Sequence, residues 1–215
     1  MKVLVIACHP DDEILGLGGR LIKHVKEGDE VNICILTKAY EPDWTKEYIS
    51  QKVAEQKKVD VFLGIKSRIN LDLPTVKLNT FPHGSLNKLL QDVVDEIQPQ
   101  IIYTHHPTDI NLDHKIAFKS SLVVSRPPLN INVLTFETLS ETEWGYGPFS
   151  PNIWVDITLE IDKKIEAFLI YESEVREYPH PRSVEGIRNL AGKRGAEANF
   201  HFAESFCLIR GYNIK

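Results

Sequence analysis

Cysteine is scarce in this 215-residue sequence, which contains only Cys8, Cys34 and Cys207. Three scattered cysteines are odd in number and do not suggest the paired framework of a disulfide-rich domain. Because Cys8 and Cys34 lie inside apolar runs, we expect them to be small buried side chains of a protein in a reducing compartment.

Long hydrophobic runs are also absent. The N-terminal run of residues 3–7 is too short for the core of a secretory signal, and a charged segment follows it directly. No stretch approaches the roughly 18 apolar residues that a transmembrane helix requires. We therefore expect a cytoplasmic protein with no membrane span.

The sequence has no excess of basic residues. It contains 25 Lys and Arg against 30 Asp and Glu, which gives a formal net charge of -5. General binding to nucleic acid or to an anionic membrane requires a basic face, so this balance argues against both classes of partner. A local basic pocket for an anionic substrate stays compatible with it.

The composition is that of a globular protein, with 42% hydrophobic and 26% charged residues. Disorder and coiled coil are thereby disfavoured. The length suits one domain with a sizeable core. Because no internal repeat, low-complexity tract or linker interrupts the chain, we expect a single domain over residues 1–215.

Strand and helix patterns alternate along much of the chain. Short β-branched apolar runs predict buried strands, and amphipathic segments that end near Gly or Pro predict helices between them. The expected strands are 3–7, 31–36, 67–73, 101–104, 132–136, 152–157 and 205–209, and the expected helices are 14–26, 46–63, 86–97, 115–125, 158–171 and 183–192. This order predicts an α/β fold, a Rossmann-like and mostly parallel sheet with helices on both faces.

A histidine and three acidic residues stand where the first expected strand passes into the first helix, in the segment His9-Pro10-Asp11-Asp12-Glu13. Ligands of open α/β sheets bind beyond the carboxyl ends of the strands. One interpretation is a helix N-terminus, which explains Pro10 and the acidic residues. The other is a metal site, because His9 and Asp12 offer an imidazole nitrogen and a carboxylate oxygen three residues apart. In that case Asp11 points elsewhere and holds a water.

A second polar segment, residues 105–114, contains three histidines and two aspartates after the expected strand 101–104. Parallel strands bring it to the same sheet edge as His9. One histidine from it would complete three protein ligands for a catalytic zinc. The alternative is a polar loop that caps the following helix. His24 and His83 are expected at the surface or in loops.

Together these segments resemble the zinc-dependent de-N-acetylases of the PIG-L/LmbE family. The resemblance is carried by residues 3–13, Gly16-Leu17-Gly18-Gly19, Gly28-Asp29-Glu30-Val31, Asp113-His114, Arg194-Gly195 and Ala203-Glu204-Ser205-Phe206. It covers nearly the whole chain, and the first motif is specific in its strand-to-helix context.

The resemblance implies a role for each matching residue. His9, Asp12 and His114 match the zinc ligands, and Asp11 matches the general base that takes a proton from the zinc-bound water. The implied reaction releases acetate and a free amine from an N-acetylated amino sugar or glycoconjugate of the N-acetylglucosamine type. Zinc is the implied cofactor, although His and Asp donors also accept other divalent ions. Relatives are often homo-oligomers, which a single sequence does not test.

The sequence departs from the family at Asn111, where many members carry a histidine. Asp109 and Asn111 remain polar and are candidates for orienting the substrate. A loop histidine, His180, is the candidate for stabilising the oxyanion, and Arg182 is the candidate for binding substrate hydroxyls or a phosphate. Trp44 could stack on a sugar ring. The alternatives are that His180 and Arg182 only bridge their loop and that Trp44 packs down on the surface.

The glycines of residues 16–19 do not have the G-x-G-x-x-G spacing of a dinucleotide site, and close packing of helix on sheet explains them better. Two functions other than de-N-acetylation stay open. One is a non-catalytic Rossmann-like protein that binds a sugar or nucleotide. The other is a metal-dependent hydrolase of another amide or ester.

Overall fold

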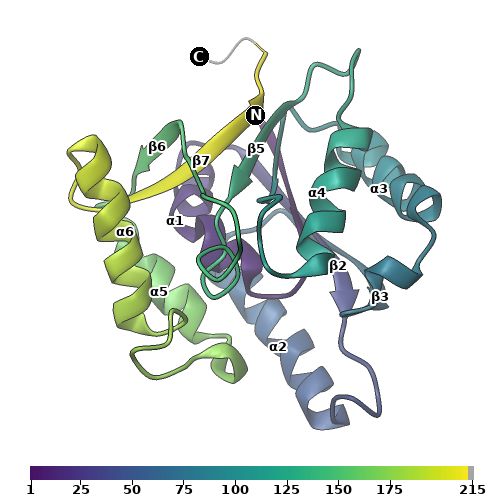
Figure 1. Ribbon diagram of the computed structural model, residues 1–215, viewed down its shortest axis with the longest axis horizontal. Helices are drawn as coiled ribbons and strands as arrows, with labels where there is room; N and C mark the ends of the chain where they lie inside the picture. Colours follow the sequence, from purple (N-terminus) through teal and green to yellow (C-terminus); the bar gives the residue numbers. More distant parts are fainter. Residues whose placement is uncertain (213–215) are drawn as a thin grey trace.

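One seven-stranded sheet organises the protein in a computed structural model that describes residues 1–212 (Figure 1). Its strand order is β3-β2-β1-β4-β5-β7-β6. The strands are β1 (Lys2–Ala7), β2 (Glu30–Lys38), β3 (Ser67–Pro74), β4 (Ile101–His105), β5 (Asn132–Phe136), β6 (Ile153–Asp156) and β7 (Ala203–Arg210). Strands β1 to β5 run parallel, and β7 pairs antiparallel with both β5 and β6. The prediction of a mostly parallel α/β sheet is confirmed.

Helices cover both faces of this sheet. The α-helices are α1 (Asp12–Lys26), α2 (Lys46–Leu63), α3 (His83–Ile97), α4 (Leu112–Val124), α5 (Ile161–Leu169) and α6 (Val184–Ala198), with short 3-10 turns η1 (Leu78–Thr80) and η2 (Glu172–Glu174). One apolar core joins α1, α2, α5 and α6 to the sheet, and a second core joins α3 and α4 to the opposite face.

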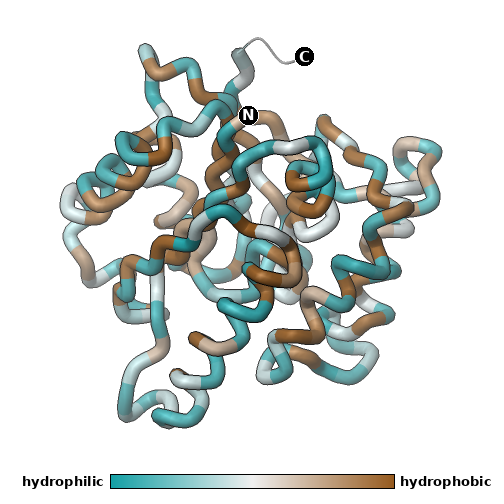
Figure 2. Tube along the Cα trace, turned by 180° about the vertical axis from the view of Figure 1, so that it is seen from behind, coloured by the Kyte–Doolittle hydropathy of each residue, from teal (hydrophilic) through white to brown (hydrophobic). Residues whose placement is uncertain are grey.

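The central strand β1 supplies side chains to both cores. Val3 and Val5 belong to the core under α1, whereas Leu4 and Ile6 belong to the core under α3 and α4. All four side chains are fully buried, as a continuous apolar run in a parallel strand requires. Figure 2 shows hydrophobic stretches of the trace in the middle of the molecule, where apolar side chains are buried.

Helix α4 begins earlier and helix α6 ends later than the sequence predicts. Helix α4 begins at Leu112 rather than at 115, because the Asn111 side chain caps it by accepting from the backbone N–H of Asp113. Helix α6 continues through Gly192 and ends at Ala198, where Asn199 adopts a left-handed conformation with φ 60°. An interior glycine weakens a helix but does not end it when the helix is packed on a sheet.

Helix α1 is broken at Leu17, whose φ of -147° is not helical. The buried Glu204 carboxylate accepts hydrogen bonds from the backbone N–H groups of Gly19 and Arg20 beyond the break, at 2.9 and 2.6 Å. The Lys164 ammonium contacts Glu204 at 2.6 Å and the Leu15 carbonyl before the break at 2.9 Å. A buried ion pair therefore satisfies the backbone groups that the break leaves without helical partners.

The glycines of α1 allow this helix to lie close to its neighbours. A Cβ on Gly16 would overlap the ring of Phe136, and one on Gly19 would lie 2.7 Å from Ile157 Cγ2. The expected reason for these glycines, close packing, is confirmed. Among residues 1–212, no helix has the length and apolar character needed to span a membrane.

Candidate metal centre and cavity

The candidate site lies where the strand order changes direction. From β1 the chain crosses to β2 and β3 on one side, whereas β4 and β5 extend the sheet on the other. The connections that follow β1 and β4 therefore lead to opposite sides of the sheet, and the space beyond the carboxyl ends of these two strands is the usual ligand position in open α/β sheets. His9 follows β1 at this point, and His114 lies in the first turn of α4, just after β4.

The three residues expected to hold a metal, His9, Asp12 and His114, come together here. His9 Nδ1 lies 3.2 Å from Asp12 Oδ2, His114 Nε2 lies 3.3 Å from the same oxygen, and the two nitrogens are 3.3 Å apart. Tetrahedral zinc bonds of about 2.0–2.2 Å require ligand atoms about 3.3–3.6 Å apart. The spacing of these atoms fits a zinc ion.

The Asp12 carboxylate has spare capacity for a metal. Its Oδ1 is buried and has no hydrogen-bond partner within residues 1–212. Burial would raise the pKa of Asp12, but the facing histidines His114, His105 and His9 hold it well below its usual value. Burial lowers the pKa of His9 and His114, yet the Asp12 charge and hydrogen bonds to aspartates outweigh it and raise these values to about 10 and about 9.

A second layer of residues orients His114. Its Nδ1 lies 2.9 Å from Asp109 Oδ2, and the other oxygen of Asp109 accepts a 2.7 Å hydrogen bond from Thr142. This carboxylate–histidine arrangement fixes the ring so that Nε2 faces Asp12, as in many zinc sites. His105 stacks on His114 with ring centroids 3.7 Å apart, and its Nε2 accepts from the Cys8 backbone N–H.

Two other groups of side chains have ligand-like spacing but fit a metal less well. In the group of Cys8, His105 and His114, burial raises the pKa of the Cys8 thiol well above its usual value, which disfavours the thiolate ligand. In the group around His24, the two ring nitrogens already face Asp29 and Tyr103. The expectation that His24 lies at the surface or in a loop is wrong, because its side chain is fully buried in the last turn of α1.

Asp11 stands beside the ligand set in an unusual backbone conformation. It occupies the N-cap position of α1 with φ 125° and ψ -31°, and its side chain makes no capping hydrogen bond. Such a conformation costs a non-glycine residue of order 1–3 kcal/mol. Arg182 Nη1 donates to Asp11 Oδ2 at 3.0 Å. Burial raises the pKa of Asp11 to about 7, against the lowering effect of the Arg182 charge.

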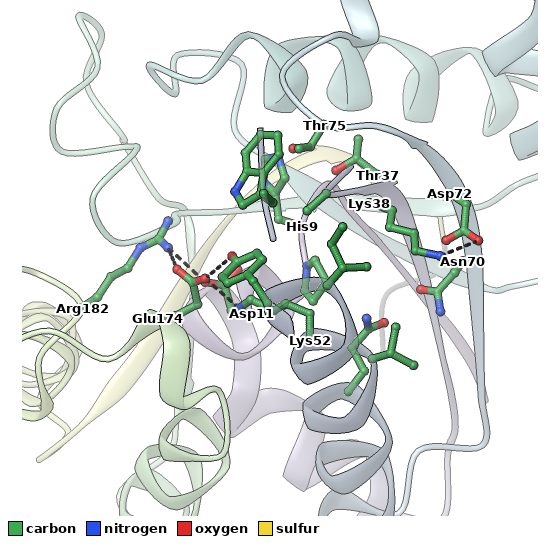
Figure 3. Close-up of a pocket in the computed structure, with 17 residues that line it drawn as sticks. His9, Asp11, Thr37, Lys38, Lys52, Asn70, Asp72, Thr75, Glu174 and Arg182 are labelled. Atoms are coloured by element: carbon green, nitrogen blue, oxygen red, sulfur yellow. Dashed lines mark hydrogen bonds and ion pairs between the residues drawn. The ribbon is translucent and has the colours of Figure 1, made fainter. Parts of the chain in front are cut away.

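A cavity of about 170 Å³ opens beside His9 and Asp11. Figure 3 shows Asp11, Glu174 and Arg182 at one end, with Lys38, Asn70 and Asp72 at the other. Its fixed charges are paired, since Lys52 lies 2.7 Å from Glu174 and Lys38 lies 3.6 Å from Asp72. Gln56 also lines this cavity, and its buried Oε1 has no hydrogen-bond partner among the described residues. The cavity therefore suits a polar group without net charge.

Two of the residues expected to bind substrate, Trp44 and Arg182, line the cavity. The Arg182 guanidinium is already engaged by Asp11, Glu174 and Glu141. Its position therefore favours control of Asp11 over capture of a phosphate.

The other expected residues do not line the cavity. Asp109 is fully buried behind His114, and the Asn111 side chain caps α4. His180 packs against Trp144 with ring centroids 5.5 Å apart, and its Nδ1 accepts from the Arg182 backbone N–H at 3.1 Å. The protonated nitrogen of the neutral ring is therefore Nε2, a hydrogen-bond donor.

The wall formed by α2 was missed in the sequence. Tyr48, Lys52 and Gln56 line the cavity from successive turns of this helix, and Glu174 of η2 meets Lys52. Spacing of four residues places such side chains on one helix face, so the pattern was present. A helix with polar residues on its inner face does not show from sequence which sheet edge it covers.

Comparisons with known proteins identify the family of this chain. Residues 4–124 match the PIG-L family model, described as GlcNAc-PI de-N-acetylase. The chain is 25% identical over 240 residues to the diacetylchitobiose deacetylase of Thermococcus kodakarensis, covering 98% of this chain and 84% of that protein.

Two solved structures share the fold. The conserved protein TT1542 of Thermus thermophilus superimposes with a TM-score of 0.80 at 24% identity, covering 99% of this chain and 96% of that one. The N,N'-diacetylchitobiose deacetylase of Pyrococcus horikoshii, complexed with its inhibitor MPG, gives 0.78 at 20% identity, covering 97% and 83%.

Proposed function

The chain belongs to the PIG-L family of de-N-acetylases, and we propose that it hydrolyses the acetamide of an N-acetylated amino sugar, free or within a glycoconjugate. The products are acetate and a free amine. The observation that carries this proposal is the ligand-spaced set of His9, Asp12 and His114 beside the buried carboxylate of Asp11. Two relatives are named as deacetylases of diacetylchitobiose, which supports an N-acetylated sugar as the substrate class.

His9, Asp12 and His114 would hold a divalent metal, with zinc favoured by the mixed nitrogen and oxygen donors and by their separations of 3.2 to 3.3 Å. When bound, zinc supplies a Lewis acid that polarises a carbonyl and lowers the pKa of a water. Asp109 keeps the His114 ring turned toward this point.

Asp11 is the proposed general base. Its carboxylate lines the cavity next to His9, and its pKa of about 7 suits a group that takes up and gives back a proton near neutral pH. Asp11 accepts a proton from the water that attacks the acetamide carbonyl. It then returns this proton to the nitrogen as the C–N bond breaks, so that the amine leaves as a neutral group.

The remainder of the substrate would lie in the cavity between α2 and the ends of β2 and β3. Paired charges and uncharged polar groups such as Gln56 and Asn70 suit the hydroxyls of a sugar, and Trp44 offers an aromatic surface for a ring face. His180 is the proposed oxyanion contact, since its Nε2 is the donating nitrogen. Asp109 and Asn111, by their positions, are proposed to orient substrate only indirectly, through His114 and the start of α4.

The test combines metal content and turnover. Purified protein should contain about one metal per chain and release acetate from N-acetylglucosamine or its β-1,4 disaccharide. Asp11→Asn should retain the metal and lower kcat by about 10²- to 10⁴-fold, the range for loss of a general base. His9→Ala should lose the metal, and His180→Ala should lower kcat with the metal retained.

Two outcomes would oppose the proposal. If Asp11→Asn leaves turnover intact, Asp11 is not the base. If His9→Ala and Asp12→Ala leave both metal content and sugar binding unchanged, the protein is a non-catalytic binder and the acidic turn serves only the start of α1. A panel of other amides and esters separates de-N-acetylation from other metal-dependent hydrolysis.

A further inference from the structure

Glu13 ends the His9–Glu13 motif and has no part in the ligand set, the base or the cavity wall described above. Its side chain is fully buried. A buried carboxylate is unfavourable unless several donors satisfy it, so its contacts indicate why it is there. Three hydrogen-bond donors contact it, and they belong to Asp11, Tyr171 and Arg68.

The first donor is the backbone of Asp11. The Asp11 N–H donates to Glu13 Oε2 at 3.0 Å. Asp11 has φ 125°, a region that side-chain-bearing residues rarely adopt, and its own side chain does not cap the helix. A hydrogen bond to this N–H therefore acts on the backbone of Asp11, whose conformation helps to set where the Asp11 carboxylate points.

The other two donors anchor Glu13 from behind. Its Oε1 accepts from Tyr171 Oη at 2.7 Å and from Arg68 Nη2 at 3.0 Å. Arg68 is itself held by Asp60, whose carboxylate meets both Nε and Nη2 at 2.7 to 3.0 Å. Strand β3 and the segment after α5 thus hold the Glu13 carboxylate directly, and helix α2 supports it through Arg68.

Asp11 makes two separate hydrogen bonds with Arg182 and Glu13. Arg182 holds its carboxylate, and Glu13 holds its backbone. The metal ligand Asp12 makes different contacts, because its Oδ2 accepts from the His9 N–H at 2.8 Å. A change at Glu13 therefore reaches Asp11 through a direct contact that the ligand set does not share.

We propose that Glu13 is a positioning residue that holds Asp11 in its disfavoured backbone conformation and so aims the base at the reacting water. This inference rests on the proposed function. Glu13 touches neither metal nor substrate, and its effect passes through Asp11. Misplacement of a catalytic group by about 1 Å costs about 10²-fold in rate. Loss of the Glu13 contact should therefore appear in kcat and not in KM or metal binding.

The experiment is a double-mutant cycle on the metal-loaded protein with N-acetylglucosamine as substrate. Glu13→Gln keeps the shape of the side chain but replaces one of its two acceptor oxygens with a donor. Glu13→Asp keeps the charge beside Arg68 and withdraws the carboxylate from the Asp11 N–H by one methylene. Each should lower kcat by about 10²-fold, with KM, metal stoichiometry and metal affinity unchanged. Tyr171→Phe, which leaves the Asp11 contact in place, is the matched control and should lower kcat much less.

The decisive arm combines Glu13→Asp with Asp11→Asn. If Glu13 acts only by positioning the Asp11 carboxylate, its loss has no further effect once that carboxylate is removed. The double variant should therefore turn over as slowly as Asp11→Asn alone. A further loss of 10²-fold in the double variant would overturn the inference, and so would loss of metal from either single variant. If the parent protein releases no acetate while it holds metal, the proposed function fails instead, which the parent assay shows before any variant is compared.

Discussion

Arg182 and Asp11 are 171 positions apart in the sequence, and Arg182 Nη1 donates to Asp11 Oδ2 at 3.0 Å. The guanidinium is fixed from other sides by Glu174 Oε2 at 3.0 Å and by Ser140 Oγ, which accepts from Nε at 2.8 Å. The C-terminal loop therefore brings a positive charge to the proposed base of an N-terminal motif.

Removal of this charge should change the pH dependence of turnover. Burial raises the pKa of Asp11 to about 7 and the Arg182 charge opposes that rise, so Arg182→Met should raise the pKa further. A base works only when ionised, so the acid limb of the kcat/KM profile should move to higher pH. The loss of activity should be greater at pH 6.5 than at pH 9.

The matched control for this profile is Arg176→Met. Arg176 lies in the same loop, but its side chain is exposed and donates to the carbonyls of Ser173 and Val175 rather than to Asp11. Its profile should coincide with that of the parent protein. An acid limb that stays in place in Arg182→Met would show that this arginine does not control the base.

Zinc binding to the metal-free protein should release protons. The pKa values of His9 and His114 are raised to about 10 and about 9, so both rings are protonated at pH 7 in the metal-free chain. A metal binds the unprotonated ring, so about two protons should leave per zinc at pH 7. The number should fall as the pH approaches 10.

Calorimetric titrations in buffers with different ionisation enthalpies measure this number. Binding at pH 7 without proton release would contradict the proposed ligand set. Competition with a chelator gives the zinc affinity in the same experiment, which should weaken as pH decreases because protons compete for the same nitrogens.

Asp109 should control metal affinity without touching the metal. Asp109→Asn replaces the charged partner of His114 Nδ1 and should weaken zinc binding by about 10- to 100-fold. Asn111→Ser, two residues away, retains an N-cap acceptor for α4 and should leave zinc affinity unchanged. Equal affinities in the two variants would argue against the positioning role of Asp109.

The buried pair of Lys164 and Glu204 should be important for stability. Lys164→Met leaves the Glu204 carboxylate buried without its cation, which should cost about 3–5 kcal/mol of unfolding free energy. Adding Glu204→Gln should recover part of that loss, since the amide carries no charge and its single oxygen can still accept from one of the N–H groups of Gly19 and Arg20. Denaturant unfolding of the parent protein and the two variants measures both effects, and a loss below 1 kcal/mol for Lys164→Met would contradict the prediction.

The sequence was informative where a function depends on neighbouring residues. His9, Asp11 and Asp12 follow a buried strand directly, so the strand-to-helix turn alone brings them to the sheet edge. The apolar pattern also predicted the seven strands and six α-helices of residues 1–212, because strands buried on both faces are continuous apolar runs and the helices between them are amphipathic.

The sequence was less informative where a role depends on tertiary packing. Asp109 and Asn111 looked equally suited to substrate, yet the early start of α4 turns one toward His114 and makes the other a cap. Lys52 and Glu174 are 122 positions apart, and each alone resembles ordinary surface charge until α2 and η2 meet at the cavity.

Gln56 should bind a hydroxyl group of the substrate. Gln56 lines the cavity, and its buried Oε1 has no hydrogen-bond partner in the described part of the chain, so a sugar hydroxyl that reaches this oxygen would be a suitable donor. One such bond is worth about 0.5–1.5 kcal/mol, so Gln56→Leu should raise KM by about 2- to 12-fold with kcat nearly unchanged.

The control for Gln56 is the exposed neighbour Lys57, whose change to Gln should leave both constants unaltered. The comparison of N-acetylglucosamine with its disaccharide then locates the hydroxyl. If the KM effect appears only with the disaccharide, Gln56 contacts the second ring, and if it appears with both, Gln56 contacts the ring that carries the acetamide. An unchanged KM of Gln56→Leu for both sugars would mean that the substrate does not extend along α2. A substrate that lay against this helix would lose its hydrogen bond to residue 56 in this variant, and its KM would rise.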